Sequence, residues 1–153
     1  MDIVSPHTRS RMMSGIKGKN TKPELIIRKA LFKRGFRYRL HKQNIPGRPD
    51  LVFNKHNAVI FINGCFWHCH DCHLFKWPQT RTEFWSEKLS GNRLRDIHNQ
   101  QELVKKGWRF LIVWECALKG RQKQSLDKIV DRIEIWLNSQ SPSESIEGQK
   151  QDN

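Results

Sequence analysis

Apolar side chains recur along the chain at spacings that predict three helices. Residues 21–34 carry an approximate helical stripe and open with Thr-Lys-Pro-Glu, in which Thr21 and Glu24 can form a capping box. Residues 93–106 and 125–137 repeat Leu, Ile and Val at helical spacing, and a glycine follows the first of these two segments. We therefore expect an amphipathic helix in each of the three segments.

Four apolar runs have the length of strands. Residues 36–40 alternate apolar and basic side chains, which is the period of a half-buried strand. Residues 51–53 and 58–62 flank Asn-Lys-His-Asn and predict a β-hairpin. Residues 109–115 are almost continuously apolar, as is typical of a strand covered on both faces. Helix, strands, helix, strand and helix follow one another, so the pattern predicts an α/β domain with a central mixed sheet flanked by helices.

Length and hydropathy narrow the class of protein. A chain of 153 residues is the size of one domain. Its longest apolar runs are far below the roughly 20 residues that a membrane helix needs. The first residues, MDIVSPHTRSRMM, contain no apolar block that could serve as a secretion signal. We expect a cytoplasmic protein, in which clustered cysteines are more often metal ligands than disulfides.

Positive charge is concentrated in the first third of the chain. The net charge is +13, and residues 1–48 contribute +11 of it through 13 Lys and Arg against two acids. Clustered cations gain affinity for phosphates by releasing condensed counterions, so nucleic acid is the favoured partner and a membrane surface the alternative. Residues 139–153 are polar, slightly acidic and poor in apolar side chains, which predicts a disordered tail.

The stretch GCFWHCHDCH, residues 64–73, holds three of the four cysteines and three of the seven histidines. Thiolate and imidazole are the ligands that zinc prefers, and four of them complete a tetrahedron. Spacing alone leaves several ligand sets open, including a set that uses His70 and a set made of the four cysteines, Cys65, Cys69, Cys72 and Cys116. The alternative interpretation of Cys116 is that it binds no metal and is a small buried apolar residue.

Four other residues can carry acid–base or metal chemistry. Asp50 opens a strand, where it can hold a divalent cation or simply form a turn. Glu24 can belong to the capping box of its helix, and it can also serve the functional site if the N-terminus of that helix faces the site. His68 is either a further zinc ligand or a general base, because histidine changes its charge near neutral pH. Asp96 can orient His68 or form a surface ion pair.

Aromatic residues in a basic protein can either contact nucleic acid or pack in the core. Phe66, Trp67 and Trp85 lie outside the most regular segments and can stack on bases or wedge between base pairs. Aromatic residues are more often part of the core, and we predict this for the tryptophans in or beside periodic segments: Trp108, Trp114 and Trp136.

Several long motifs together resemble one known family. They are GRPD at 47–50, VIFINGCFWHCHDC at 59–72, KWPQTRTEFW at 76–85 and GWRFLIVWECALKGR at 107–121. They are similar to the very short patch repair endonucleases, in order through residues 5–137. The resemblance implies a restriction-endonuclease-like fold and an enzyme that nicks one DNA strand 5' to the thymine of a T·G mismatch. Such mismatches arise when 5-methylcytosine deaminates.

The resemblance also implies a division of the chain. Residues 1–20 would form a basic segment that clamps DNA, residues 21–138 the endonuclease domain, and residues 139–153 the tail. One structural zinc ion would be held by Cys65, His70, Cys72 and Cys116. This set leaves Cys69 as an extra thiol and frees His68 to act as the catalytic base.

A catalytic magnesium ion is implied as well. Asp50 would bind it directly beside the backbone carbonyl of Ile62, and Glu24 would act through a water molecule. Asp96 would orient His68. The strand that ends at Ile62 lacks the second acid and the lysine of ordinary restriction nucleases, so the reaction would depend on His68 as the base.

DNA contacts complete what the resemblance implies. Three aromatic side chains would intercalate beside the mismatch: Phe66, Trp67 and Trp85. Asn63 stands where relatives can carry a histidine that contacts phosphate. The basic N-terminal segment would contact the duplex through Arg9, Arg11, Lys17 and Lys19. The expected partner is double-stranded DNA with a T·G mismatch, with mismatch-repair proteins as further partners.

Two other functions fit the same residues. One is a zinc-stabilised DNA-binding module without catalysis. The other is a nicking endonuclease of broader specificity, which keeps the chemistry but needs no mismatch. For the mismatch endonuclease we expect a monomer that is associated with the nucleoid through DNA and has no membrane partner.

Overall fold

The computed structural model describes residues 20–149. All of the predicted DNA-clamping segment except Asn20, including its contact residues Arg9, Arg11, Lys17 and Lys19, lies outside this range. The described helices are α2 (Lys22–Lys33), α3 (Thr82–Lys105) and α4 (Leu126–Leu137), with short 3-10 helices η1 (Asn54–His56) and η2 (Glu115–Ala117). The strands are β1 (Arg39–Leu40), β2 (Leu51–Phe53), β3 (Ala58–Asn63), β4 (Arg109–Trp114) and β5 (Ser143–Ile146).

The strands form one five-stranded sheet in the order β1-β2-β3-β4-β5. The pairs β1–β2 and β2–β3 are antiparallel, whereas β3–β4 and β4–β5 are parallel. The predicted hairpin is therefore present, with η1 as its turn. The predicted α/β class with a mixed sheet is confirmed.

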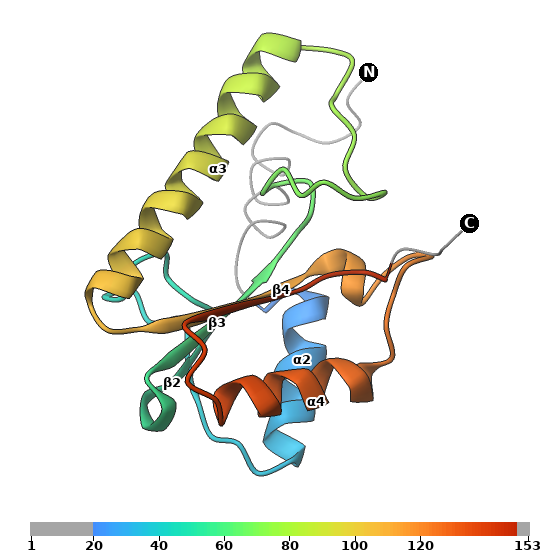
Figure 1. Ribbon diagram of the computed structural model, residues 1–153. Helices are drawn as coiled ribbons and strands as arrows, with labels where there is room; N and C mark the ends of the chain where they lie inside the picture. Colours follow the sequence, from blue (N-terminus) through green and yellow to red (C-terminus); the bar gives the residue numbers. More distant parts are fainter. Residues whose placement is uncertain (1–19, 150–153) are drawn as a thin grey trace.

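Helices cover both faces of the sheet (Figure 1): α2 and α4 lie together on one face and α3 lies on the other. Alternation along β2 explains the arrangement, because Leu51 and Phe53 face α2 and α4 while Val52 faces α3. The larger core contains Trp136, as predicted, and is closed by helix residues that are almost fully buried, including Ile27, Leu31, Ile129 and Ile133. Trp108 is only partly buried and packs on the smaller core.

Two elements differ in length from their predictions. Helix α3 begins at Thr82 rather than at residue 93. Apolar periodicity missed its first turns because only Leu89 and Leu103 are buried along its 24 residues. Strand β1 is reduced to two residues, since Tyr38 packs on the larger core and donates its hydroxyl to the carbonyl of Arg28 at 2.7 Å. Within residues 20–149, no helix combines the length and the apolar composition that a bilayer crossing requires.

The prediction of a disordered tail over residues 139–153 is wrong for the part that the structure describes. Residues 143–146 form β5 on the free edge of β4, where Val113 pairs with Ile146. Ile146 is fully buried in the larger core. The prediction failed because it rested on the polar composition of the segment. Composition gives little weight to a single anchoring side chain and does not reveal that the edge of β4 is available for pairing.

Candidate active site and metal centre

A cleft of about 810 Å³ opens beside the carboxyl end of β3. The N-terminus of α2, the start of β2, the loop after β3 and one side of α3 line it. The lining includes seven of the residues that the sequence singled out: Asp50, Ile62, Asn63, Phe66, Trp67, His68 and Asp96. Folding thus brings together side chains that lie far apart along the chain.

Asp50 lies immediately before β2, where the amide N–H of Ile62 donates to its Oδ2 at 2.7 Å. Burial, together with the nearby carboxylate of Glu24, raises the pKa of Asp50 to about 7, although the hydrogen bond from Ile62 acts in the opposite direction. An ionised Asp50 therefore lacks compensating positive charge. A bound divalent cation would supply that charge.

Glu24 is 1% exposed and has several partners. Its Oε1 accepts the N–H of Asn20 at 3.1 Å, and its Oε2 accepts a guanidinium N–H of Arg28 at 2.8 Å. The Nε2 atom of His41 lies 2.9 Å from each carboxylate oxygen. The amide N–H of Glu24 donates to Thr21 Oγ1 at 3.4 Å, as one half of the predicted capping box.

His41 and Arg28 are residues of the site that the sequence analysis missed. One ligand atom from each of Glu24, His41 and Asp50 lies within 4.8 Å of the others. The backbone N–H of His41 donates to the carbonyl of Asp50 at 3.1 Å, because the antiparallel pairing of β1 with β2 continues past the end of β1. The signal that could have found His41 is the register of these two strands, which the sequence does not give.

His68 and Asp96 meet across the cleft. The Nδ1 atom of His68 lies 2.5 Å from Oδ2 of Asp96, and both side chains are partly exposed. His68 comes from the loop after β3 and Asp96 from the middle of α3, and both line the cleft. If Nδ1 donates its proton to the carboxylate, Nε2 keeps a lone pair that can accept a proton.

The three predicted intercalating residues form one aromatic cluster. The ring centroid of Phe66 lies 5.1 Å from that of Trp67 and 5.5 Å from that of Trp85. All three side chains are partly exposed, so they do not belong to the core. Phe84, which is 43% exposed, contacts Trp85, and Trp77, which is 53% exposed, connects to Phe66 through Phe75, so these rings extend the aromatic surface beyond the sequence prediction.

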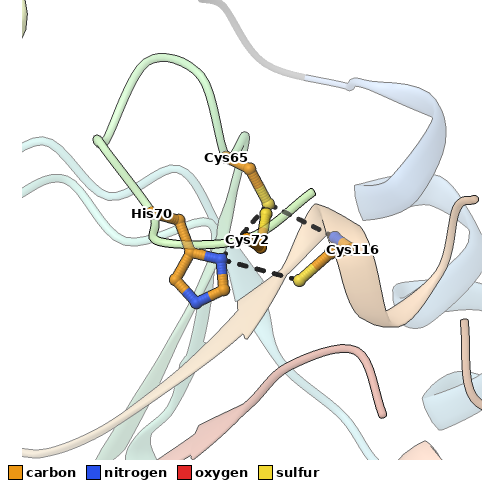
Figure 2. Close-up of side chains that lie close together, drawn as sticks. All are labelled: Cys65, His70, Cys72 and Cys116. Carbon is orange, nitrogen blue, oxygen red and sulfur yellow. Dashed lines mark hydrogen bonds between the residues drawn. The ribbon is translucent and has the colours of Figure 1, made fainter. Parts of the chain in front are cut away.

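A second group of residues forms a candidate metal centre. Figure 2 shows Cys65, His70, Cys72 and Cys116 converging on one point, and their ligand atoms all lie within 4.8 Å of one another. Cys69 lies outside this group and takes a positive φ of 52°. The geometry therefore favours the set that contains His70 over the set of four cysteines.

The separations within this group fit a tetrahedral metal. His70 Nδ1 lies 3.5 Å from Cys65 Sγ and 3.6 Å from Cys116 Sγ. Zinc–sulfur bonds of about 2.3 Å and zinc–nitrogen bonds of about 2.0 to 2.1 Å, at a tetrahedral angle, place sulfur and nitrogen about 3.6 Å apart. Three sulfurs and one imidazole are also a donor set that zinc prefers. The group could hold a zinc ion.

Parallel pairing of β3 with β4 explains how the ligands meet. Cys65 follows the end of β3 and Cys116 follows the end of β4, so the two sulfurs lie at one edge of the sheet. Burial raises the pKa of both thiols, while a backbone N–H donated to each sulfur lowers it. A bound divalent cation would favour the thiolate forms. Trp114, predicted as core, instead stacks on the ring of His70 at a centroid distance of 4.0 Å.

Comparison with known proteins identifies the family. A family model described as DNA mismatch endonuclease Vsr matches residues 1–74. The chain is 43% identical over 148 residues to the DNA mismatch endonuclease Vsr of Escherichia coli strain K12, an alignment that covers 97% of this chain and 95% of that protein. The chain belongs to the Vsr family. The restriction-endonuclease-like α/β fold of Vsr proteins agrees with the mixed sheet described above.

Other Vsr relatives carry a second description. The chain is 40% identical over 132 residues to a type II nicking enzyme of Xanthomonas oryzae, covering 85% of this chain and 97% of that enzyme. It is 43% identical over 134 residues to a type II nicking enzyme of Neisseria meningitidis serogroup A, covering 86% and 96%. The predicted resemblance is thus confirmed, and the chain is a member of a family of DNA endonucleases.

Proposed function

We propose that this chain nicks one strand of double-stranded DNA 5' to the thymine of a T·G mismatch, by magnesium-dependent hydrolysis of a phosphodiester. The observation that carries the proposal is the cleft in which buried Asp50 and the His68–Asp96 pair lie together. Membership of the Vsr family supports the mismatch as substrate. The enzyme would act as a monomer in the cytoplasm, bound to DNA.

Charge and aromatic residues would bring the duplex to the cleft. Most of the net charge of +13 lies in residues 1–48, so phosphate contacts would supply affinity that depends on salt. Phe66, Trp67 and Trp85 would wedge beside the mismatch. A T·G pair is weaker than a matched pair, so unstacking it costs less there, and deformability contributes to recognition.

Asp50 and the carbonyl of Ile62 would hold the catalytic cation. A magnesium ion bound there would polarise the scissile phosphate and stabilise the leaving oxygen. Glu24 would act through water rather than directly, because both of its oxygens already have protein partners. His41 and Arg28 would fix the carboxylate of Glu24 in this position.

His68 would act as the general base. With Nδ1 held by Asp96, its Nε2 would take a proton from the attacking water on the cleft side. Asp96 would stabilise the imidazolium that forms and would prevent the ring from turning. Asn63, which is 9% exposed at the end of β3 and lines the cleft, would contact a DNA phosphate.

Zinc would have a structural role. Cys65, His70, Cys72 and Cys116 fit a zinc ion, and together they would close the loop that carries Phe66, Trp67 and His68. A fixed loop holds the proposed base and two of the proposed wedges in one arrangement. No step of the hydrolysis needs this ion.

A cleavage assay on paired duplexes tests the proposal. The protein is incubated with an end-labelled duplex containing one T·G mismatch in a methylation-type context and with its matched control, in magnesium and then in EDTA. A magnesium-dependent nick 5' to the thymine, absent from the control, is the expected result. Equal nicking of both duplexes would favour an enzyme of broader specificity, and the nicking-enzyme relatives make this the second candidate. Binding without a nick in several contexts would favour a zinc-stabilised DNA-binding module.

A further inference from the structure

The C-terminal segment, residues 143–149, lies against the candidate metal centre. Glu147 Oε2 lies 2.8 Å from Nε2 of His70, the ring nitrogen opposite the one that faces the cysteine sulfurs. The backbone N–H of Gly148 donates to Cys116 Sγ at 3.2 Å. Two neighbouring residues of the segment therefore contact two members of the four-residue metal group.

Several contacts hold this segment in place. β5 pairs with β4 from Ser143 to Ile146, and the side chain of Ile146 is fully buried. Beyond the strand, Gln124 Nε2 donates to the carbonyl of Glu147 at 2.6 Å. The N–H of Gln149 donates to the carbonyl of Gln122 at 2.7 Å. The backbone is thus anchored on both sides of the contacts with the metal group.

Packing around Gly148 shows how closely the segment approaches the metal group. A Cβ atom added at Gly148 would lie 2.7 Å from the carbonyl oxygen of Cys116 and 2.9 Å from Cβ of Gln122. No side chain fits there without displacing backbone. Only glycine lets the amide reach the sulfur of Cys116 at this position.

The contact with Glu147 selects one form of the His70 ring. When Nε2 carries the proton and donates it to the carboxylate, Nδ1 keeps its lone pair, directed at the space between Cys65 and Cys116. A carboxylate partner of this kind also makes the imidazole a more basic metal ligand. The amide of Gly148 in turn stabilises the thiolate of Cys116.

We propose that Glu147 and Gly148 are positioning residues of the metal centre, and that the C-terminal segment serves to retain the zinc. This inference rests on the proposed zinc site. It gives the C-terminal segment, residues 143–149, a role in the active site, because the loop closed by the metal carries His68.

Zinc transfer to a chromogenic chelator tests the inference on the full chain. Each protein is first assayed for zinc content, and the rate of transfer to excess chelator is then measured. Glu147→Ala should release zinc about tenfold faster than the wild type or more, and Glu147→Gln should fall between, because its amide oxygen accepts the same hydrogen bond without the charge. The matched control is Glu144→Ala, which removes the same charge from the same C-terminal segment and loses the ion pair with Arg132 and the hydrogen bond from the N–H of Ser145, but no contact with the metal group.

Long-range ¹H–¹⁵N correlation of the wild-type histidines gives a second readout that a merely structural role would not produce. His70 should carry its proton on Nε2, with Nδ1 shifted by metal coordination. Coordination through Nε2 would overturn the inference, as would release from Glu147→Ala at the rate of Glu144→Ala. A wild-type protein isolated without zinc, and unable to take it up, would instead refute the zinc site itself.

Discussion

At the residue scale, the account depends on a buried carboxylate. Asp50 occupies a site where ionisation is disfavoured by burial and by the charge of Glu24. Such a group is costly for folding and suited to binding a cation. Two predictions follow from single residues in this cleft.

The first prediction concerns stability. Burial and the carboxylate of Glu24 raise the pKa of Asp50 from its ordinary value of 3.8 to about 7, so the folded state is penalised as pH rises from about 4 through 7. Asp50→Asn keeps an acceptor for the N–H of Ile62 and removes this penalty. In magnesium-free buffer at pH 8 it should increase the free energy of unfolding by roughly 2 kcal/mol or more.

Urea denaturation at pH 4 and pH 8 checks this difference. At pH 4 the gain should nearly vanish, because Asp50 is then largely protonated in the folded state. An equal gain at both pH values, or a loss of stability at pH 8, would contradict the burial argument.

The second prediction concerns the His68–Asp96 pair. His68→Ala should lower the single-turnover cleavage rate by about 10² to 10⁴, the usual contribution of a general base. Asp96→Asn should lower it less, because Nε2 remains while its orientation and the stabilisation of the imidazolium are lost. Duplex affinity, measured by anisotropy without magnesium, should change little in either variant; a parallel loss of affinity would show a role in DNA binding instead.

At the scale of elements, apolar periodicity predicted much of the fold. It located α2, α4 and the β2–β3 hairpin because these elements bury a regular set of side chains. It missed the first half of α3 and all of β5, where one or two buried residues do the anchoring. A metal site was predictable from the sequence because three cysteines and three histidines lie close together in the chain, but spacing left several ligand sets open and only the family resemblance implied this one. His41 was not, because its proximity to Asp50 depends on strand pairing.

The third prediction belongs to the elements that carry the metal group. Cys116→Ser removes a proposed ligand supplied by η2, so zinc content should fall and thermal stability should drop. Cys69→Ser is the matched control, because Cys69 lies in the same loop as the ligands but outside the group. Metal analysis of purified proteins should find wild-type zinc in Cys69→Ser. Loss of zinc in that variant would overturn the ligand assignment.

At the scale of the whole molecule, the chain combines an excess of positive charge with an aromatic cluster at the cleft that contains Asp50 and His68. The charge supplies attraction to any duplex, so selectivity for a mismatch must come from elsewhere. The cluster of Phe66, Trp67 and Trp85 is the candidate, since two of its members line the cleft.

The fourth prediction tests that cluster. Phe66→Ala should weaken binding to a T·G duplex by about 1 to 3 kcal/mol, the usual cost of losing one stacking contact, with a smaller effect on a matched duplex. Phe32→Ala is the control, because Phe32 is 53% exposed on α2 and does not line the cleft. Fluorescence anisotropy at one salt concentration makes the comparison. Equal losses on both duplexes would assign Phe66 to general affinity rather than to mismatch recognition.

The most direct test of the central claim is single-turnover cleavage of a T·G duplex by the wild type and by Asp50→Asn, at magnesium and protein concentrations that saturate the wild type. The account predicts a nick 5' to the thymine by the wild type and a loss of at least about 10³ in rate for the variant, with folding and duplex affinity retained. Cleavage by Asp50→Asn at a rate near that of the wild type would contradict the assignment of this cleft as the active site.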